Sequence, residues 1–150
     1  MKGKWLILTM LFALVTFGAA TVGAHCEIPC GIYDDQLRTD LIAEHATTIE
    51  KSMKKIVELS KQNPVNYNQL VRWVSNKEKH ADEIQHIVTQ YFMTQRIKPD
   101  AKNYSEKLAV LHKMLIYAMK CKQSTDVVHV NTLRSLTKEF EILYFGHSHK

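Results

Sequence analysis

Apolar side chains recur every three or four residues along most of this chain, and that spacing restricts its fold more than any other feature. One such run extends from Asp34 until Asn63 and Pro64 interrupt it, because proline cannot continue a helix. A second run begins with a capping pattern at Asn66 and reaches about Arg96. No segment shows a sustained period-two alternation of the kind that marks a half-buried strand. The sequence therefore predicts amphipathic helices and no sheet.

Two further runs complete the pattern. One begins after Ser105, and the other begins at a cap near Asp126 and ends at Gly146. Helices of this kind bury their apolar faces against one another, so we expect one all-α domain, an antiparallel four-helix bundle. The apolar positions that define the four runs are Leu37, Leu41, Ile42, Ala46, Ile49, Met53, Ile56 and Leu59; Leu70, Trp73, Val74, Ala81, Ile84, Val88, Tyr91 and Phe92; Leu108, Leu111, Leu115 and Met119; and Val130, Leu133, Leu136, Phe140 and Leu143.

The beginning of the chain has the layout of a secretory signal peptide. Two lysines form a basic start, an apolar run follows, and the small residues of GAATVGA precede His25. We expect cleavage before His25, which gives a removed leader over residues 1–24 and a mature domain over residues 25–150. Export then places the mature protein outside the cell, in a periplasm or in another extracytoplasmic compartment.

Two other interpretations of the leader remain open. The stretch from Trp5 to Ala24 is about as long as the 20 residues needed to span a bilayer, so it is also compatible with an uncleaved anchor. Cleavage after Ala20 is the second alternative, and it leaves extra residues ahead of His25. The choice matters because only cleavage directly before His25 frees the amino group of that residue.

The charge of the mature chain is mild. Removing Lys2 and Lys4 lowers the formal net charge from +5 to +3. A small excess of this kind can steer small anions toward a local positive patch, but it lacks the concentrated basic stripe of a nucleic-acid-binding protein. We therefore expect no nucleic-acid partner, and no stable membrane insertion once the leader is removed.

Two of the three cysteines lie close together in HCEIPCGIYDD, residues 25–35, directly after the expected cleavage site. The His25 amine, the Cys26 amide nitrogen and the Cys26 sulfur can close fused chelate rings, and Cys30 can return through a turn as a fourth ligand. Two nitrogens and two sulfurs in a plane suit nickel(II) or copper(II), whereas zinc prefers a tetrahedron. A small disulfide, a thiol redox pair and half of a zinc site remain as alternatives for this cysteine spacing. The third cysteine, Cys121, is expected to be a buried structural thiol.

The segment HCEIPCGIYDD resembles the nickel-binding hook of the nickel superoxide dismutases, whose mature chains begin His-Cys-x-x-Pro-Cys-Gly-x-Tyr. The four predicted helices are similar to the bundle of that family. The resemblance covers every motif position of the hook and the rest of the chain in pattern. It implies that the His25 amine, the Cys26 amide nitrogen and the sulfurs of Cys26 and Cys30 bind about one nickel ion per chain in a plane, with the His25 imidazole axial in the oxidised state.

The resemblance also implies an enzymatic function. Superoxide, a small anionic substrate, would be converted to oxygen and hydrogen peroxide by cycling between nickel(II) and nickel(III). The thiolates and the deprotonated amide would stabilise nickel(III), and the Tyr33 hydroxyl would face the open side of the metal. The family implies a homohexamer in which neighbouring bundles shelter the hooks. The alternatives are a secreted nickel or copper carrier with the same ligands but no turnover, and a helical interaction protein in which Cys26 and Cys30 form a disulfide.

Other positions correspond less directly to the family pattern. The segment QYF resembles a second-helix segment that supplies another tyrosine near the hook, which is Tyr91 here. In the family an acid on the first helix and an arginine on the second hold the axial imidazole. No residue of this chain aligns securely with either role. The candidates are Asp40 or Glu44 for the acid and Arg72 or His80 for its partner.

Overall fold

The computed structural model describes residues 34–147, so the predicted hook residues His25, Cys26, Cys30 and Tyr33 lie outside the described part of the chain. Within that part every regular element is a helix, as the apolar spacing predicts. The predicted all-α class is confirmed. The elements in chain order are α2 (Gln36–Ser60), α3 (Tyr67–His86), the π-helix η1 (Ile87–Arg96), α4 (Tyr104–Gln123) and α5 (Val127–Phe145).

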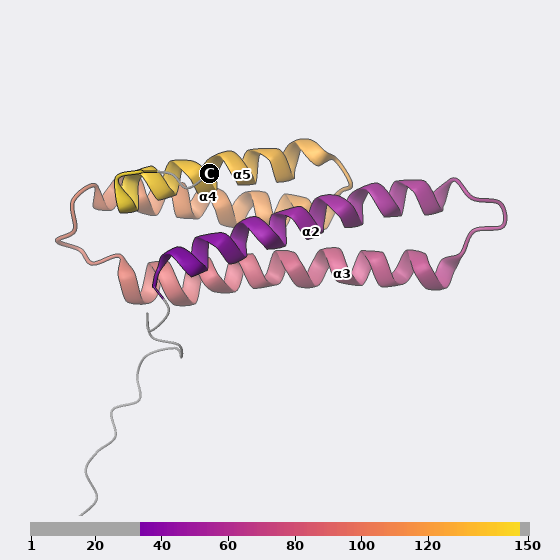
Figure 1. The fold of residues 1–150 in the computed structure, drawn as a ribbon, viewed down its shortest axis with the longest axis horizontal. Coiled ribbons are helices and arrows are strands. Elements are labelled where there is room, and N and C mark those ends of the chain that lie inside the picture. Colours follow the sequence, from indigo (N-terminus) through magenta and orange to yellow (C-terminus); the bar gives the residue numbers. More distant parts are fainter. Residues whose placement is uncertain (1–33, 148–150) are drawn as a thin grey trace, which may run out of the picture.

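The helices form an antiparallel bundle in which each helix packs on the next one in the chain and α5 returns to α2. Figure 1 shows that the start of α2, the end of the helix formed by α3 and η1, and the end of α5 lie at the same end of the bundle. We call this end the proximal end, and it comprises the start of α2, η1, the start of α4 and the end of α5. It matters for function because the predicted hook immediately precedes α2 in sequence.

Three predicted helix boundaries are set by local capping. The Asn66 side chain accepts a hydrogen bond from the Gln69 amide at 3.1 Å, and Asp126 accepts one from the Val128 amide at 2.9 Å. Each side chain satisfies one of the amides that a helix start leaves without a partner. Gly146 ends α5 with a φ of 85°, a left-handed conformation that glycine adopts at little cost.

The core runs along the centre of the bundle and contains most of the predicted apolar positions. Full burial of such a side chain contributes about 1.5–3 kcal/mol to stability. The prediction of burial is wrong at three positions, since the side chains of Leu37, Val74 and Met119 are 40%, 39% and 42% exposed. The completely buried large side chains include Ile42, Ile49, Met53, Ile84, Val88, Phe92, Leu111, Met114, Val130, Leu133 and Phe140.

Helix α4 shows why one of these predictions fails. One row of its buried positions is Val110, Met114, Ala118 and Cys121, spaced by four, four and three residues, and Lys107 and Leu111 are buried beside it. This register turns the neighbouring Met119 away from the core. Cys121 itself is fully buried, as predicted for a structural thiol.

The second predicted helix reaches Arg96, but its last ten residues are π-helical rather than α-helical. The Ile97 amide donates to the Phe92 carbonyl at 2.9 Å, and the side chains of Thr94 and Gln95 also donate to carbonyls five residues earlier. A π-helix is rare and is frequently found at functional sites. None of the helices within residues 34–147 is both long and apolar enough to cross a membrane.

Candidate functional site

A cluster of polar side chains lies at the proximal end, where the chain enters α2. The Tyr144 hydroxyl donates to Asp35 Oδ2 at 2.6 Å, and the Tyr91 hydroxyl donates to Asp35 Oδ1. Arg96 Nε lies 2.9 Å from the same Oδ1, and Arg96 Nη2 donates to the Tyr91 hydroxyl at 2.9 Å. We call these four residues the Asp35 cluster. Both carboxylate oxygens of Asp35 are therefore engaged, and the side chains that bind them come from η1 and α5.

The backbone just before α2 has an unusual conformation that places Asp35. Asp34 has a φ of 74°, in the left-handed region that aspartate tolerates better than most residues. Asp35 then occupies the N-cap position of α2, where an aspartate normally accepts a hydrogen bond from an amide of the first turn. Its side chain makes no such capping bond. The carboxylate binds the two tyrosines and Arg96 instead. It therefore stabilises the contact of the α2 start with η1 and α5 rather than the helix itself.

The π-helix explains how Tyr91 and Arg96 reach Asp35 together. In an α-helix residues five apart lie on different faces, whereas in a π-helix, whose hydrogen bonds join residues five apart, they lie one above the other. Tyr91 and Arg96 are separated by five residues within η1. The π register therefore places the hydroxyl and the guanidinium on one face, toward the start of α2.

Aromatic rings hold the two tyrosines in place. Phe92 packs edge-on against Phe140 with ring centroids 4.8 Å apart, and Phe140 stacks on Tyr144 at 5.3 Å. Tyr91 is only 2% exposed, and its ring meets Phe92 edge-on at 5.2 Å. Aromatic pairs of this kind contribute about 0.5–1.5 kcal/mol beyond the area that they bury. The hydroxyl groups that bind Asp35 are thus supported by the packed core.

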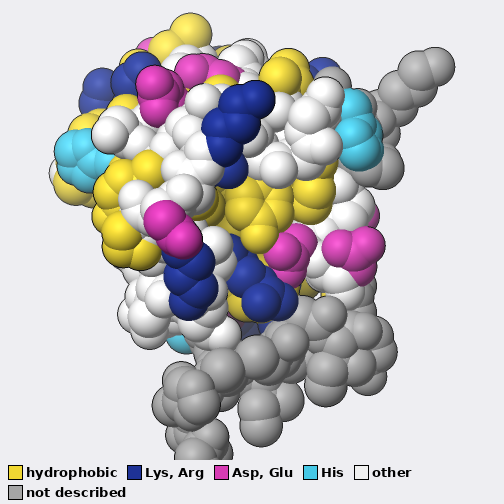
Figure 2. All heavy atoms as spheres, turned by 90° about the vertical axis from the view of Figure 1, so that its left-hand side faces the viewer, with side chains coloured by type: hydrophobic (Ala, Val, Ile, Leu, Met, Phe, Trp, Pro, Cys, Tyr) yellow, Lys and Arg dark blue, Asp and Glu magenta, His cyan; other side chains and the backbone are white. Residues whose placement is uncertain are grey.

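The charge at the proximal end is mixed. Figure 2 shows this end of the bundle, where basic and acidic side chains lie among hydrophobic ones. The guanidinium carbons of Arg38 and Arg96 lie 4.7 and 4.8 Å from the centroid of the Tyr91 ring, within cation–π range. Lys107 Nζ lies 5.4 Å from the centroid of the Tyr144 ring. Cationic side chains therefore lie against both tyrosines that bind Asp35, and one of them, Arg96, also pairs with the carboxylate itself.

These contacts shift the acidity of the cluster. Burial opposes the negative charge of Asp35, but hydrogen bonds from Tyr144 and Tyr91 and the charge of Arg96 outweigh it and hold the pKa of the carboxyl below its usual value. Burial and the hydrogen bond to Asp35 raise the pKa of both Tyr91 and Tyr144. At neutral pH Asp35 is therefore a carboxylate and both tyrosines are neutral donors.

The candidate partners of the His25 imidazole are not brought together as a group. Asp40 accepts a hydrogen bond from the Gln36 side chain at 3.0 Å near the start of α2, whereas Arg72 lies near the start of α3, at the opposite end of the bundle. His80 Nδ1 lies 2.8 Å from His45 Nδ1, beside the charge of Glu44. Burial and the neighbouring His80 lower the pKa of His45. This histidine pair belongs to the middle of the helices rather than to the proximal end.

The described residues offer no alternative nickel site. No group of three or more histidine, cysteine or acidic side chains within residues 34–147 is arranged to hold a metal ion. Cys121 is the single cysteine of this part of the chain, and burial raises the pKa of its thiol to about 11. Its burial and the raised pKa both disfavour the thiolate, which is the form that binds metals. The other two cysteines of the sequence, Cys26 and Cys30, lie outside the described residues.

The sequence did not identify Asp35, Arg96 or Tyr144 as site residues. Tyr91 was singled out by resemblance, and the structure places its hydroxyl on Asp35, two residues after Tyr33 in the chain. The acidic pair that closes the hook motif, Asp34 and Asp35, was the one available signal. Its partners lie 56 and 109 residues away, so no local pattern pointed to them.

The family model for nickel-containing superoxide dismutase matches residues 20–148 of this chain. The chain belongs to that family. It is a nickel-dependent superoxide dismutase, an oxidoreductase that uses nickel as its cofactor and superoxide as its substrate. No curated protein and no solved structure gave a significant match. Nothing favours the metal-carrier alternative over the enzyme.

The ligands available in this nickel superoxide dismutase fit the cofactor. Nickel in a redox role needs electron-rich ligands, and thiolates are the softest that a protein provides. Cys26 and Cys30 would supply two of them within five consecutive residues, and the family match includes this segment. The buried Cys121 thiol does not compete for the metal.

Proposed function

We propose that this superoxide dismutase holds its nickel through residues 25–30. The ligands are the amine and imidazole of His25, the amide nitrogen and sulfur of Cys26, and the sulfur of Cys30. The observation that carries the assignment is the burial of Cys121, the single cysteine of the described residues, together with the lack of any three-residue ligand cluster there. The family match supports it further, because it extends over the hook segment.

The proposed residues divide the work of dismutation. Two superoxide anions and two protons give one oxygen and one hydrogen peroxide, and the bound nickel supplies the one-electron chemistry that both halves need. The Cys26 and Cys30 thiolates and the Cys26 amide donate electron density that makes this chemistry accessible. The Tyr33 hydroxyl orients a small anion or water by hydrogen bonding and excludes bulkier species. Exposed thiolates are oxidised by peroxide, so restricted access protects them.

The cysteine assignment is tested with the double variant Cys26→Ser/Cys30→Ser. Metal analysis and a superoxide assay should show about one nickel per chain in the unchanged protein and little or none in the variant, because serine is a poor nickel ligand. Helical circular dichroism should be retained, since the core lies within residues 34–147. Cys121→Ala is the matched control, and it should keep its nickel. Full nickel occupancy in the double variant would refute the assignment.

The role of Tyr33 is tested by Tyr33→Phe, which removes the hydroxyl and keeps the ring. Nickel should stay bound while turnover slows or anion inhibition changes. Release of nickel from the variant would instead identify Tyr33 as a structural support of the hook.

We also propose export with cleavage directly before His25. The basic start, apolar run and small residues of the leader support this. Amino-terminal sequencing of the natural protein tests it, and a mature chain that begins at Thr21 would contradict it.

Assembly as a homohexamer is proposed from the family resemblance. Exposed apolar side chains on α3 and α5 offer surface that contact between chains can bury. Light scattering on the purified protein should give the mass of six chains, and the mass of a single chain would contradict the proposal. The most exposed large apolar side chains among the described residues are Tyr67, Val71, Val128 and Ile142.

A further inference from the structure

We propose that Asp35 is a positioning residue for the nickel hook: its carboxylate, held by Tyr91, Tyr144 and Arg96, fixes the point at which residues 25–34 join the bundle. The inference rests on the assignment of nickel to residues 25–30. The contacts of Asp35 with these three residues all lie within the described part of the chain.

The first support is the number of elements that meet at one carboxylate. Asp35 stands at the start of α2, its Oδ1 is bound by Tyr91 and Arg96 of η1, and its Oδ2 accepts a 2.6 Å hydrogen bond from Tyr144 of α5. Hydrogen bonds to a charged acceptor are roughly twice as strong as neutral ones. A chain held on both carboxylate oxygens by two other elements cannot shift without breaking several of these bonds together.

The second support is that the Asp35 side chain does not cap its own helix. An aspartate at an N-cap position generally binds a backbone amide of its own helix, which contributes about 1 kcal/mol. Asp35 makes no such bond. The helix start is still favourable for a negative charge because of the helix dipole. The carboxylate thus links the N-cap residue of α2 to the core rather than to the helix itself.

The third support is the rigidity of the groups that bind Asp35. Tyr91 is 2% exposed, and Tyr144 packs on the completely buried Phe140. The π register of η1 fixes Tyr91 and Arg96 relative to each other. The binding site for the carboxylate is therefore formed by the packed core and does not depend on flexible surface side chains.

Chain length links this fixed point to the metal ligands. Cys30 precedes Asp35 by five residues, so its Cα lies at most about 18 Å from that of Asp35 even in an extended chain. Asp34, with its left-handed φ of 74°, further restricts the direction in which the preceding residues leave. Fixing one end of a short metal-binding segment reduces the conformational entropy that it loses when it closes around the metal. Nickel should therefore bind more weakly when the Asp35 contacts are lost.

The test is a nickel titration of the metal-free mature chain against a competing chelator. Asp35→Ala should weaken nickel binding about tenfold, since freeing one or two residues costs roughly that much in ordering. The Arg38 amide, which donates to the Asp35 carbonyl at 3.0 Å, should also exchange its hydrogen about tenfold faster. Glu50→Ala is the matched control, because Glu50 is another α2 acid bound by a residue of α5. Its nickel affinity should stay within about twofold of the unchanged protein.

Tyr144→Phe keeps the inference testable if Asp35→Ala does not fold. It preserves the ring and removes one donor, so nickel affinity should fall in the same direction but by less, about threefold. Unchanged nickel affinity in a folded Asp35→Ala, or in Tyr144→Phe where Asp35→Ala does not fold, would overturn the positioning role. The Cys26→Ser/Cys30→Ser variant in the same titration separates the two proposals. If it binds nickel normally, the hook assignment fails; if it loses nickel while the cluster variants keep theirs, the positioning role alone fails.

Discussion

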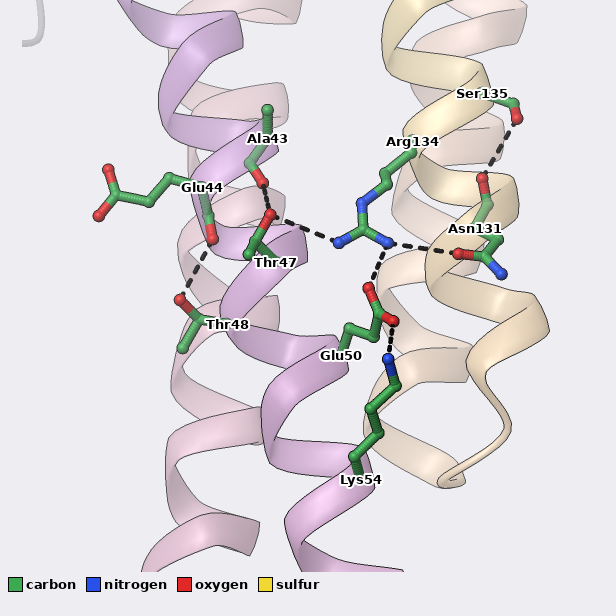
Figure 3. A network of polar contacts seen from close by, with 9 residues as sticks. All are labelled: Ala43, Glu44, Thr47, Thr48, Glu50, Lys54, Asn131, Arg134 and Ser135. Atoms are coloured by element: carbon green, nitrogen blue, oxygen red, sulfur yellow. Dashed lines mark hydrogen bonds and ion pairs between the residues drawn. The ribbon is translucent and has the colours of Figure 1, made fainter.

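Two acids, Asp35 at the N-cap of α2 and Glu50 within α2, each receive a contact from α5, yet they have different surroundings. Their side chains are about equally exposed, at 21% and 24%. Glu50 is bound by Arg134 at 2.6 Å and by Lys54, whose side chains are 31% and 65% exposed. Figure 3 shows this network on the outside of α2 and α5, with Thr47 and Asn131 completing the contacts of Arg134.

The difference lies in the partners rather than in the acid. Asp35 is bound by two tyrosine hydroxyls whose rings belong to the core and by a guanidinium placed by the π-helix. Glu50 is bound by flexible basic side chains, and ion pairs of that kind contribute only about 0–1 kcal/mol. The comparison teaches that the exposure of a carboxylate does not measure its contribution. What matters is whether its partners keep their positions when the carboxylate is removed.

The largest difference should appear in stability. Asp35→Ala should lower the free energy of unfolding by about 2–3 kcal/mol, because two partly buried hydroxyls and Arg96 lose their acceptor. Glu50→Ala should cost about 1 kcal/mol or less, because water can replace its partners. Urea unfolding at neutral pH measures both values. Equal costs for the two variants would remove the distinction between the networks.

A smaller difference should appear on acidification. The pKa of Asp35 is lowered in the folded chain, so its contribution is fully present above the unfolded value of about 3.8 and is lost as the pH falls through the lower folded value. The stability gap between the unchanged protein and Asp35→Asn should therefore be constant near neutral pH and should shrink below about pH 4.

The corresponding gap for Glu50→Gln should be small at every pH. The hydrogen bonds from Lys54 and Arg134 also lower the pKa of Glu50, which gives the same sign, but its partners are exposed and screened by water. Denaturant midpoints between neutral pH and about pH 2.5 test both curves. A gap for Asp35→Asn that persists unchanged at the lowest pH would show that the charge of Asp35 is not what its partners bind.

The smallest effect should come from single hydroxyl groups. Tyr91→Phe keeps the ring between its aromatic and cationic neighbours and removes one donor, so it should cost about 1 kcal/mol. Thr47→Val is the counterpart in the Glu50 network, where the Thr47 hydroxyl lies 3.4 Å from Arg134, and it should change stability by less than about 0.5 kcal/mol. Thermal unfolding measures both. A larger cost for Thr47→Val would reverse the ranking of the two networks.

The fold was predictable because its signals are local. The caps at Asn66 and Asp126, the terminal Gly146 and the apolar spacing all act within a few residues, and the structure confirms each of them. The exposure of Leu37 and Met119 was not predictable in the same way. Their spacing fits a buried stripe, and only packing against the other helices decides which edge of a stripe faces water.

The Asp35 cluster was not predictable because its contacts are distant in sequence. The apolar residues Ile87, Val88, Tyr91 and Phe92 fit an α-helical period, so nothing in the spacing distinguishes the π register that places Arg96 beside Tyr91. Tyr144 bonds to Asp35 across 109 residues. The hook, in contrast, could be proposed from sequence alone, since its proposed ligands are nearly consecutive and its motif stands directly after the predicted leader.

The central claim is that the free amino group of His25 is a nickel ligand, and the length of the amino terminus tests it most directly. Two forms should be compared: the chain that begins at His25 and a chain that keeps Ala24 ahead of it. Both should show the same helical circular dichroism. The form beginning at His25 should bind about one nickel and turn over superoxide, because its terminal amine is available to the metal. The extended form should have little or no activity, since an amide nitrogen is far less basic than an amine. Full nickel occupancy and full activity in the extended form would contradict the account.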